Sequence, residues 1–121
     1  MQKFKSFEEI VSWQKARELN KKIYLTTASA NFRIDFDLAR QMRRSSISIS
    51  SNIAEGFERN SDREFAHFLF IAKASAGELR SQLYLASDLN YIEDAQHREL
   101  VDEVSKISQL LGGLIKYLQK S

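Results

Sequence analysis

The fold of this 121-residue chain is decided by residues 61–89, SDREFAHFLFIAKASAGELRSQLYLASDL. Apolar residues recur there at spacings of three and four, the period of one face of an α-helix. They are Phe65, Leu69, Ala72, Ala76, Leu79, Leu83 and Ala86. Ser61 followed by Glu64 has the spacing of a capping box, which marks a helix start. We therefore predict a long amphipathic helix from about Asp62 to Leu89.

The same period appears in segments at about 7–30, 38–58 and 94–118, and predicts a helix in each. Ser6 with Glu9 suggests a cap for the first, Asp35 or Asp37 for the second, and Asn60 a stop for the second. Residues 31–37 read as a loop. The predicted inward residues are Ala16, Leu19, Ile23, Thr26 and Ala30; Leu38, Met42, Ser45, Ile49, Ile53 and Phe57; and Leu100, Val104, Ile107, Leu111, Leu114, Ile115 and Leu118.

Composition supports the helical interpretation. The chain contains no proline, which would interrupt helices, and only four glycines. Short connections between long helices make neighbours antiparallel. We predict an all-α fold: one domain over residues 1–121, an antiparallel up-down four-helix bundle with a left-handed supercoil.

Several classes of protein are excluded or disfavoured by residue content. The absence of cysteine rules out disulfides and thiolate chemistry and suits a cytoplasmic location. No stretch approaches the roughly 18 apolar residues of a membrane span, and the start does not resemble a signal peptide. We expect no cofactor and no membrane association.

Basic residues are concentrated in the first half of the chain. Residues 1–60 hold 11 Lys/Arg against 7 Asp/Glu, whereas residues 61–121 hold 7 against 9. Arginine forks suit phosphate oxygens, so we predict nucleic-acid binding through a basic face. The alternative is a solvated face or intersubunit ion pairs with Glu55 and Glu58. Trp13 and Tyr24 share a helical stripe and are candidates for base stacking, although Trp13 fits packing better. The predicted binding residues are Lys15, Arg17, Lys21, Lys22, Arg40, Arg43 and Arg44.

Two of the predicted helices also have apolar or small residues on the face opposite the core. Such a surface usually marks a contact with another chain, and we predict a homo-oligomer interface there. The alternative is that neighbouring helices of the same bundle half cover this face. The predicted interface residues are Ile47, Ser51, Ala54, Phe70, Ala74, Gly77, Ser81 and Leu85.

Two motifs have spacings found in catalytic or metal sites, but both fit a structural role better. Asn52, Glu55 and Gly56 read better as a structural polar motif with a close helix approach than as a site with a catalytic base. Glu64 and His67 match the Glu-x-x-His spacing of di-iron bundles, but the chain holds one such motif, and His67 falls opposite the core stripe. We expect no catalytic residues and no metal site.

The chain resembles a known bacterial family in VSWQKA at 11–16, QMRRSSISISSNIAEGF at 41–57, much of 61–83, and GLI at 113–115. This family comprises the 23S ribosomal RNA intervening-sequence proteins; distant relatives are accessory proteins of diversity-generating retroelements. The family often has proline at the position of Ser50, glycine at that of Ala74, and proline in the first interhelix loop, and this chain departs from it at these points.

The resemblance implies an up-down bundle that assembles into a ring-like homopentamer, with no established enzymatic activity. Related members are encoded inside 23S rRNA genes, and the accessory proteins bind RNA and a polymerase. The leading hypothesis is a non-enzymatic, oligomeric protein that binds structured RNA, or DNA, through the basic faces of its first two helices. The alternative is a scaffold or accessory protein that binds a protein such as a reverse transcriptase.

Overall fold

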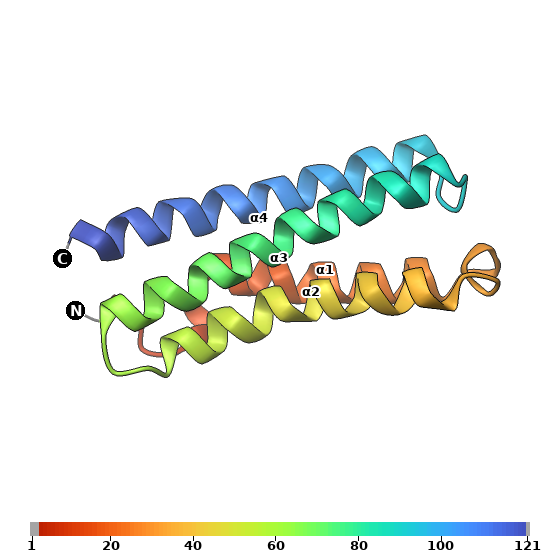
Figure 1. Cartoon of the computed structure of the whole chain (residues 1–121). Coiled ribbons are helices and arrows are strands. Elements are labelled where there is room, and N and C mark those ends of the chain that lie inside the picture. Colours follow the sequence, from red (N-terminus) through yellow and green to blue (C-terminus); the bar gives the residue numbers. More distant parts are fainter. Residues whose placement is uncertain (1–2, 121) are drawn as a thin grey trace.

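A computed structural model describes residues 3–120 of the chain. Within these residues four α-helices follow one another: α1 (Val11–Thr27), α2 (Phe36–Phe57), α3 (Asp62–Asp88) and α4 (Asp94–Lys120). Two short 3-10 turns, η1 (Phe7–Glu9) and η2 (Ala30–Phe32), flank α1. Consecutive helices run in opposite directions, so the α1–α2 and α3–α4 connections lie at the same end of the molecule (Figure 1). The all-α, up-down four-helix bundle is therefore confirmed.

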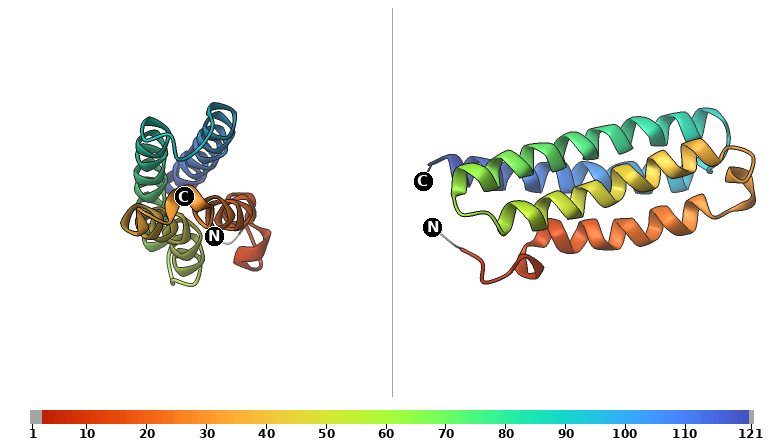
Figure 2. Two further views of the ribbon diagram at one scale, coloured as in Figure 1. Left: turned by 90° about the vertical axis from the view of Figure 1, so that its right-hand side faces the viewer. Right: turned by 60° about the horizontal axis from the view of Figure 1, so that its bottom comes forward.

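Helix α3 packs most extensively, against α2 on one side and α4 on the other, while α1 packs mainly on α2 and less on α4. The two further views show the helices surrounding a common axis (Figure 2). The inward stripe predicted for α3 is fully confirmed, from Phe65 to Ala86. The apolar stripe of each helix thus lines one continuous core. None of the helices among the described residues is long and apolar enough to cross a bilayer.

The helix ends explain why the connections can be short. The Asp35 carboxylate accepts a hydrogen bond from the backbone N–H of Leu38 (3.1 Å), and Ser61 Oγ accepts one from Glu64 (3.1 Å). Both residues therefore cap helix N-termini as predicted. Helix α3 ends in a left-handed residue, Asn90 (φ 62°), and the next N–H donates to the Ala86 carbonyl (2.9 Å). This arrangement satisfies carbonyls that the helix end leaves open.

The first predicted helix is wrong at both ends. Ile10 adopts an extended backbone that separates η1 from α1, and Ser6 makes no capping hydrogen bond through its side chain. The break buries the Ile10 side chain in the core and sets the Phe7 ring 5.1 Å from that of Trp13. Contacts with distant parts of the chain thus override the local helical pattern.

The connection after α1 also differs from the prediction. Ala30, expected in the core, is exposed in η2, and Phe32, expected in a loop, is buried instead. The Phe32 ring lies 5.1 Å from that of Tyr91 and closes the end of the bundle. The second helix begins at Phe36 rather than Leu38, and Glu58 rather than Asn60 forms its C-cap.

Candidate nucleic-acid interface

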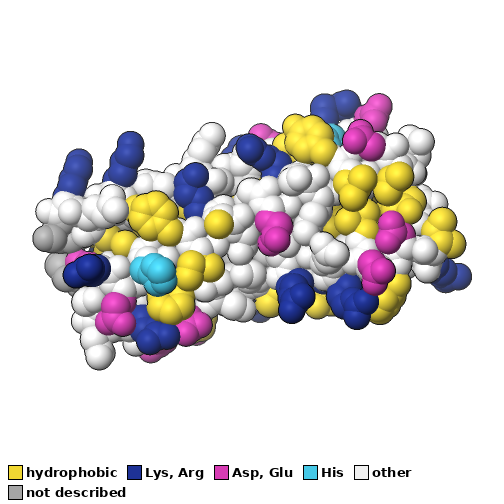
Figure 3. Space-filling model, in the orientation of Figure 1, with side chains coloured by type: hydrophobic (Ala, Val, Ile, Leu, Met, Phe, Trp, Pro, Cys, Tyr) yellow, Lys and Arg dark blue, Asp and Glu magenta, His cyan; other side chains and the backbone are white. Residues whose placement is uncertain are grey.

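A cleft of about 660 Å³ opens where the end of α1, η2 and the first half of α2 meet. Its lining is mostly apolar and aromatic, and arginines lie among these side chains. The lining arginines are Arg33, Arg40, Arg43 and Arg44. Figure 3 shows Lys and Arg side chains over α2, toward the end of the bundle that holds the α1–α2 connection, with hydrophobic and acidic side chains near them. The cleft therefore combines apolar walls with a positively charged rim.

Arg43 is held in place by three contacts with α1. Its Nε donates to Thr27 Oγ1 (2.8 Å) and its Nη2 to the Tyr24 carbonyl (3.3 Å). Its guanidinium also lies 4.5 Å from the centre of the Tyr24 ring, a cation–π distance. The hydrogen bonds use two of the five N–H groups of the guanidinium, and the other three meet no acceptor among residues 3–120. Arg43 is therefore oriented and still able to donate.

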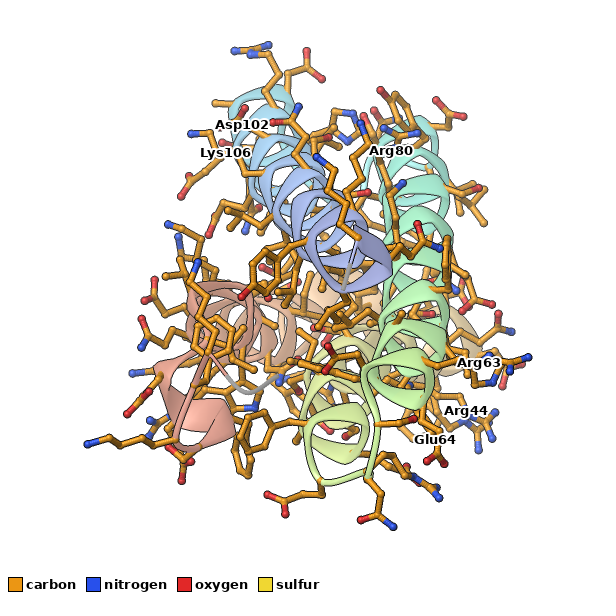
Figure 4. All side chains as sticks on the ribbon, turned by 90° about the vertical axis from the view of Figure 1, so that its left-hand side faces the viewer. Arg44, Arg63, Glu64, Arg80, Asp102 and Lys106 are labelled. Carbon is orange, nitrogen blue, oxygen red and sulfur yellow. The ribbon has the colours of Figure 1, made fainter. Side chains whose placement is uncertain are left out.

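The other arginines of the cleft are more exposed. Arg40 forms an ion pair with Asp37 (2.8 Å) and lies 5.1 Å from the centre of the Phe36 ring. Arg44 projects away from the bundle in Figure 4, on the flank of α2 that adjoins α3. Among residues 3–120, the Asp37–Arg40 pair is the one ion pair that engages the cleft arginines. The cleft therefore keeps an excess of positive charge.

The basic residues predicted on α1 do not form one surface. Arg17 and Lys21 line a separate hollow on the exposed surface of α1, together with Trp13 and the acidic Glu18. Lys22 instead faces α4, where it pairs with Glu103 (2.9 Å) and Glu99 (3.4 Å). The Glu103 hydrogen bond is the main reason why the pKa of Lys22 is raised. Lys15, two helical turns before Lys22, shares that side of the helix.

The outer faces of α2 and α3 are open in the single chain. Most residues predicted for the oligomer interface are exposed, including Ile47, Gly77 and Ser81, and Ala54 is half-buried. Phe70 and Leu85 expose 50% and 47% of their surface. These side chains form an apolar stripe on the outer face of α3 that the other helices of the bundle leave exposed.

Asn52, Glu55 and Gly56, predicted as one structural polar motif, make different contacts. Asn52 donates to the Ser48 carbonyl (2.8 Å) and to Ser48 Oγ (2.9 Å), and that hydroxyl lies 2.9 Å from Ser75 Oγ of α3. Glu55 instead pairs with Arg59 at the surface (2.7 Å). Asn52 thus helps to connect α2 with α3, whereas Glu55 stays outside that network.

Gly56 belongs to the packing of α2 against α3. A Cβ atom at this position would lie 2.7 Å from Phe68 Cβ and 3.2 Å from the Phe65 carbonyl oxygen. The two helices therefore approach one another here more closely than any larger residue allows.

Within residues 3–120, no cluster of three or more His, Asp or Glu side chains has the geometry to hold a metal ion. His67 is exposed, as predicted from its helical position, and its ring packs 5.5 Å from that of Phe68. Glu64 belongs to the cap of α3.

The sequence analysis did not identify Arg33 or Phe36, which both line the cleft. Both fall in the segment that reads as a loop, where periodicity carries no information. The signal available there was compositional: Phe32, Arg33, Ile34 and Phe36 give a nominally exposed loop an unusual apolar and cationic content.

Comparison with known proteins finds one matching family and a similar solved structure. The sequence matches the family described as 23S rRNA-intervening sequence protein over residues 8–113. It also resembles a crystal structure of a protein of unknown function from the S23 ribosomal protein family of Bacteroides thetaiotaomicron. The two share 30% sequence identity with a TM-score of 0.81, covering 88% of this chain and 96% of that one. No curated protein matches the sequence.

Proposed function

The chain belongs to the 23S rRNA-intervening sequence protein family, and from that premise we propose that it is a non-enzymatic, oligomeric bundle that binds structured RNA through α1 and α2. The observation that carries this proposal is the arginine cleft. Planar guanidinium groups bind phosphate oxygens with two parallel hydrogen bonds, which makes arginine the preferred side chain for a nucleic-acid backbone.

Further basic residues on α1 support the same function. Arg17 and Lys21 add positive charge on α1 outside the cleft, in a hollow that Glu18 also lines. Repeating this surface in an oligomer would multiply the field that attracts a polyanion. Lys22 contributes less to RNA binding, because its charge is already paired with two glutamates of α4. Lys15 lies on the same side of α1 and is therefore also directed away from the cleft.

Binding to labelled RNA hairpins at increasing salt tests the proposal. We expect the logarithm of the affinity to fall linearly with the logarithm of salt concentration, because each neutralised phosphate releases counterions. The double variant Arg40→Glu/Arg44→Glu should bind at least roughly tenfold more weakly, because it reverses two charges beside the RNA phosphates. Arg43 is left unchanged in this variant because it holds α2 to α1.

The matched control is Arg63→Glu/Arg80→Glu, which makes the same charge change on α3, where Figure 4 shows both side chains directed outward. It should retain the affinity of the unmodified chain within about twofold after correction for net charge. Absence of binding at low salt, or equal losses in both double variants, would show that the arginine cleft is not an RNA-binding surface.

A second candidate function is that of a scaffold or accessory protein for a protein partner such as a reverse transcriptase. The exposed apolar stripe of α3, with Phe70 and Leu85, favours it. In that case Arg40→Glu/Arg44→Glu would leave capture of the purified partner intact, whereas Leu85→Glu would abolish it.

A further inference from the structure

Resting on the proposed RNA-binding function, we propose that the arginine cleft receives an unpaired nucleotide. Its base lies against the arginine–aromatic pairs and its phosphate binds the arginines at the rim. The protein accordingly selects single-stranded segments of RNA, such as loops and ends, over continuous duplex.

The chemistry of the cleft walls separates these two forms of RNA. A duplex presents phosphates and sugars outward and keeps its bases stacked inside, so only the arginines of the cleft would find a ligand. The apolar walls, made by Phe32, Phe36 and Ala39, would stay empty against it. An unpaired nucleotide supplies both an anionic phosphate and a flat apolar base, and it matches both parts of the lining.

The aromatic rings are placed for stacking. Phe36 exposes 64% and Tyr24 exposes 41% of its surface, although both side chains line the cleft. Each ring carries a guanidinium, from Arg40 at 5.1 Å and from Arg43 at 4.5 Å. Unpaired bases stack both on aromatic rings and on guanidinium planes. Two such pairs in one cleft form a stacking platform.

The platform is held firmly where it meets α1. Arg43 is fixed by its hydrogen bonds to Thr27 and to the Tyr24 carbonyl, so it loses little conformational freedom when a ligand binds. Phe36 stands at the first turn of α2 with its ring exposed. Because stacking does not read base edges, we expect little sequence preference.

An acidic peptide would satisfy the charge of the rim without using the paired planar groups. The proposal therefore commits to RNA, and the test includes a peptide. Free mononucleotide shares the chemistry of an unpaired RNA residue but lacks the neighbouring phosphates that Arg33 and Arg44, which also line the cleft, would bind.

The test compares two labelled RNAs of equal charge, an unpaired single-stranded oligoadenylate and a blunt-ended duplex, by fluorescence anisotropy at one salt concentration. We expect the single strand to bind at least about tenfold more tightly. Phe36→Ala should weaken binding of the single strand roughly tenfold, the loss expected for one stacked base, and leave duplex binding within about twofold. Arg40→Gln should weaken both.

Matched variants keep the result interpretable. Tyr84→Ala removes an aromatic ring of similar exposure (52%) from α3 and should change neither affinity. Phe36→Leu retains an apolar side chain at the start of α2 and should lose single-strand affinity as Phe36→Ala does. Circular dichroism of each variant should match the unmodified chain, because Phe36 lies outside the core.

The outcomes separate the two levels of the proposal. If neither RNA binds, the proposed function itself fails. If both bind equally and Phe36→Ala alters neither, the chain binds RNA but the unpaired-nucleotide site is wrong. Displacement of the single strand by polyglutamate, or by adenosine monophosphate at the same nucleotide concentration, would also overturn it in favour of a peptide or a free nucleotide.

Discussion

At the scale of single residues, Gly56 is the position where the packing of α2 on α3 leaves no room. We predict that Gly56→Ala destabilises the protein by about 1–3 kcal/mol, because the new methyl group would meet Phe68 Cβ and the Phe65 carbonyl, neither of which moves without its helix. The free energy of unfolding in urea measures this directly.

Gly113→Ala is the matched control for that prediction. Gly113 lies within α4, and a Cβ there meets no heavy atom within 4 Å. Alanine should therefore stabilise α4 by about 0.5–1 kcal/mol through its better helix propensity. If both alanines stabilise the protein alike, the close approach of α2 and α3 at Gly56 is refuted.

At the scale of elements, a part-buried polar cluster helps to connect α1 to α2. Asn20 accepts a hydrogen bond from Ser46 Oγ (2.7 Å) and donates to Ser50 Oγ (3.0 Å), and Ser46 is fully buried. Asn20→Ala should cost about 1–3 kcal/mol of unfolding free energy, because it leaves the Ser46 hydroxyl without its acceptor.

A double-mutant cycle isolates that coupling. Adding Ser46→Ala to Asn20→Ala should cost little more than Asn20→Ala alone, giving an interaction energy of about 0.5–3 kcal/mol between the two sites. Asn31→Ala removes an exposed hydrogen bond to the Tyr91 carbonyl and should change stability by less than about 0.5 kcal/mol. Strictly additive losses at Asn20 and Ser46 would mean that the cluster does not couple the helices.

At the scale of the whole molecule, the outer stripe of α3 leads us to expect self-association. Light scattering should return a particle several times the 14.0 kDa mass of the chain. Leu85→Glu should reduce it to the single-chain mass, because an unpaired carboxylate in an apolar interface is strongly unfavourable. Leu25→Glu places the same charge at an exposed leucine of α1 and should leave the assembly unchanged. A 14.0 kDa particle for the unmodified chain would contradict the predicted interface.

The sequence could predict much of the fold because helix periodicity is local. The inward stripe of α3 and the caps at Asp35 and Ser61 are written in spacings of a few residues, and the structure confirms them. Ile10 and Phe32 could not be placed in this way. Their burial depends on packing against residues far along the chain, which interrupts the helical pattern around them.

Local patterns along the chain specify four amphipathic helices, their core faces and a concentration of positive charge in the first half of the chain. Which charges meet depends on how the helices pack against one another. This packing gathers Arg33, Arg40 and Arg43 around the rings of Tyr24 and Phe36, and it turns Lys22 toward α4. The physical reason is that periodicity fixes the face of a side chain on its own helix, whereas the rotation and register of packed helices, and the path of the loop between them, fix its neighbours.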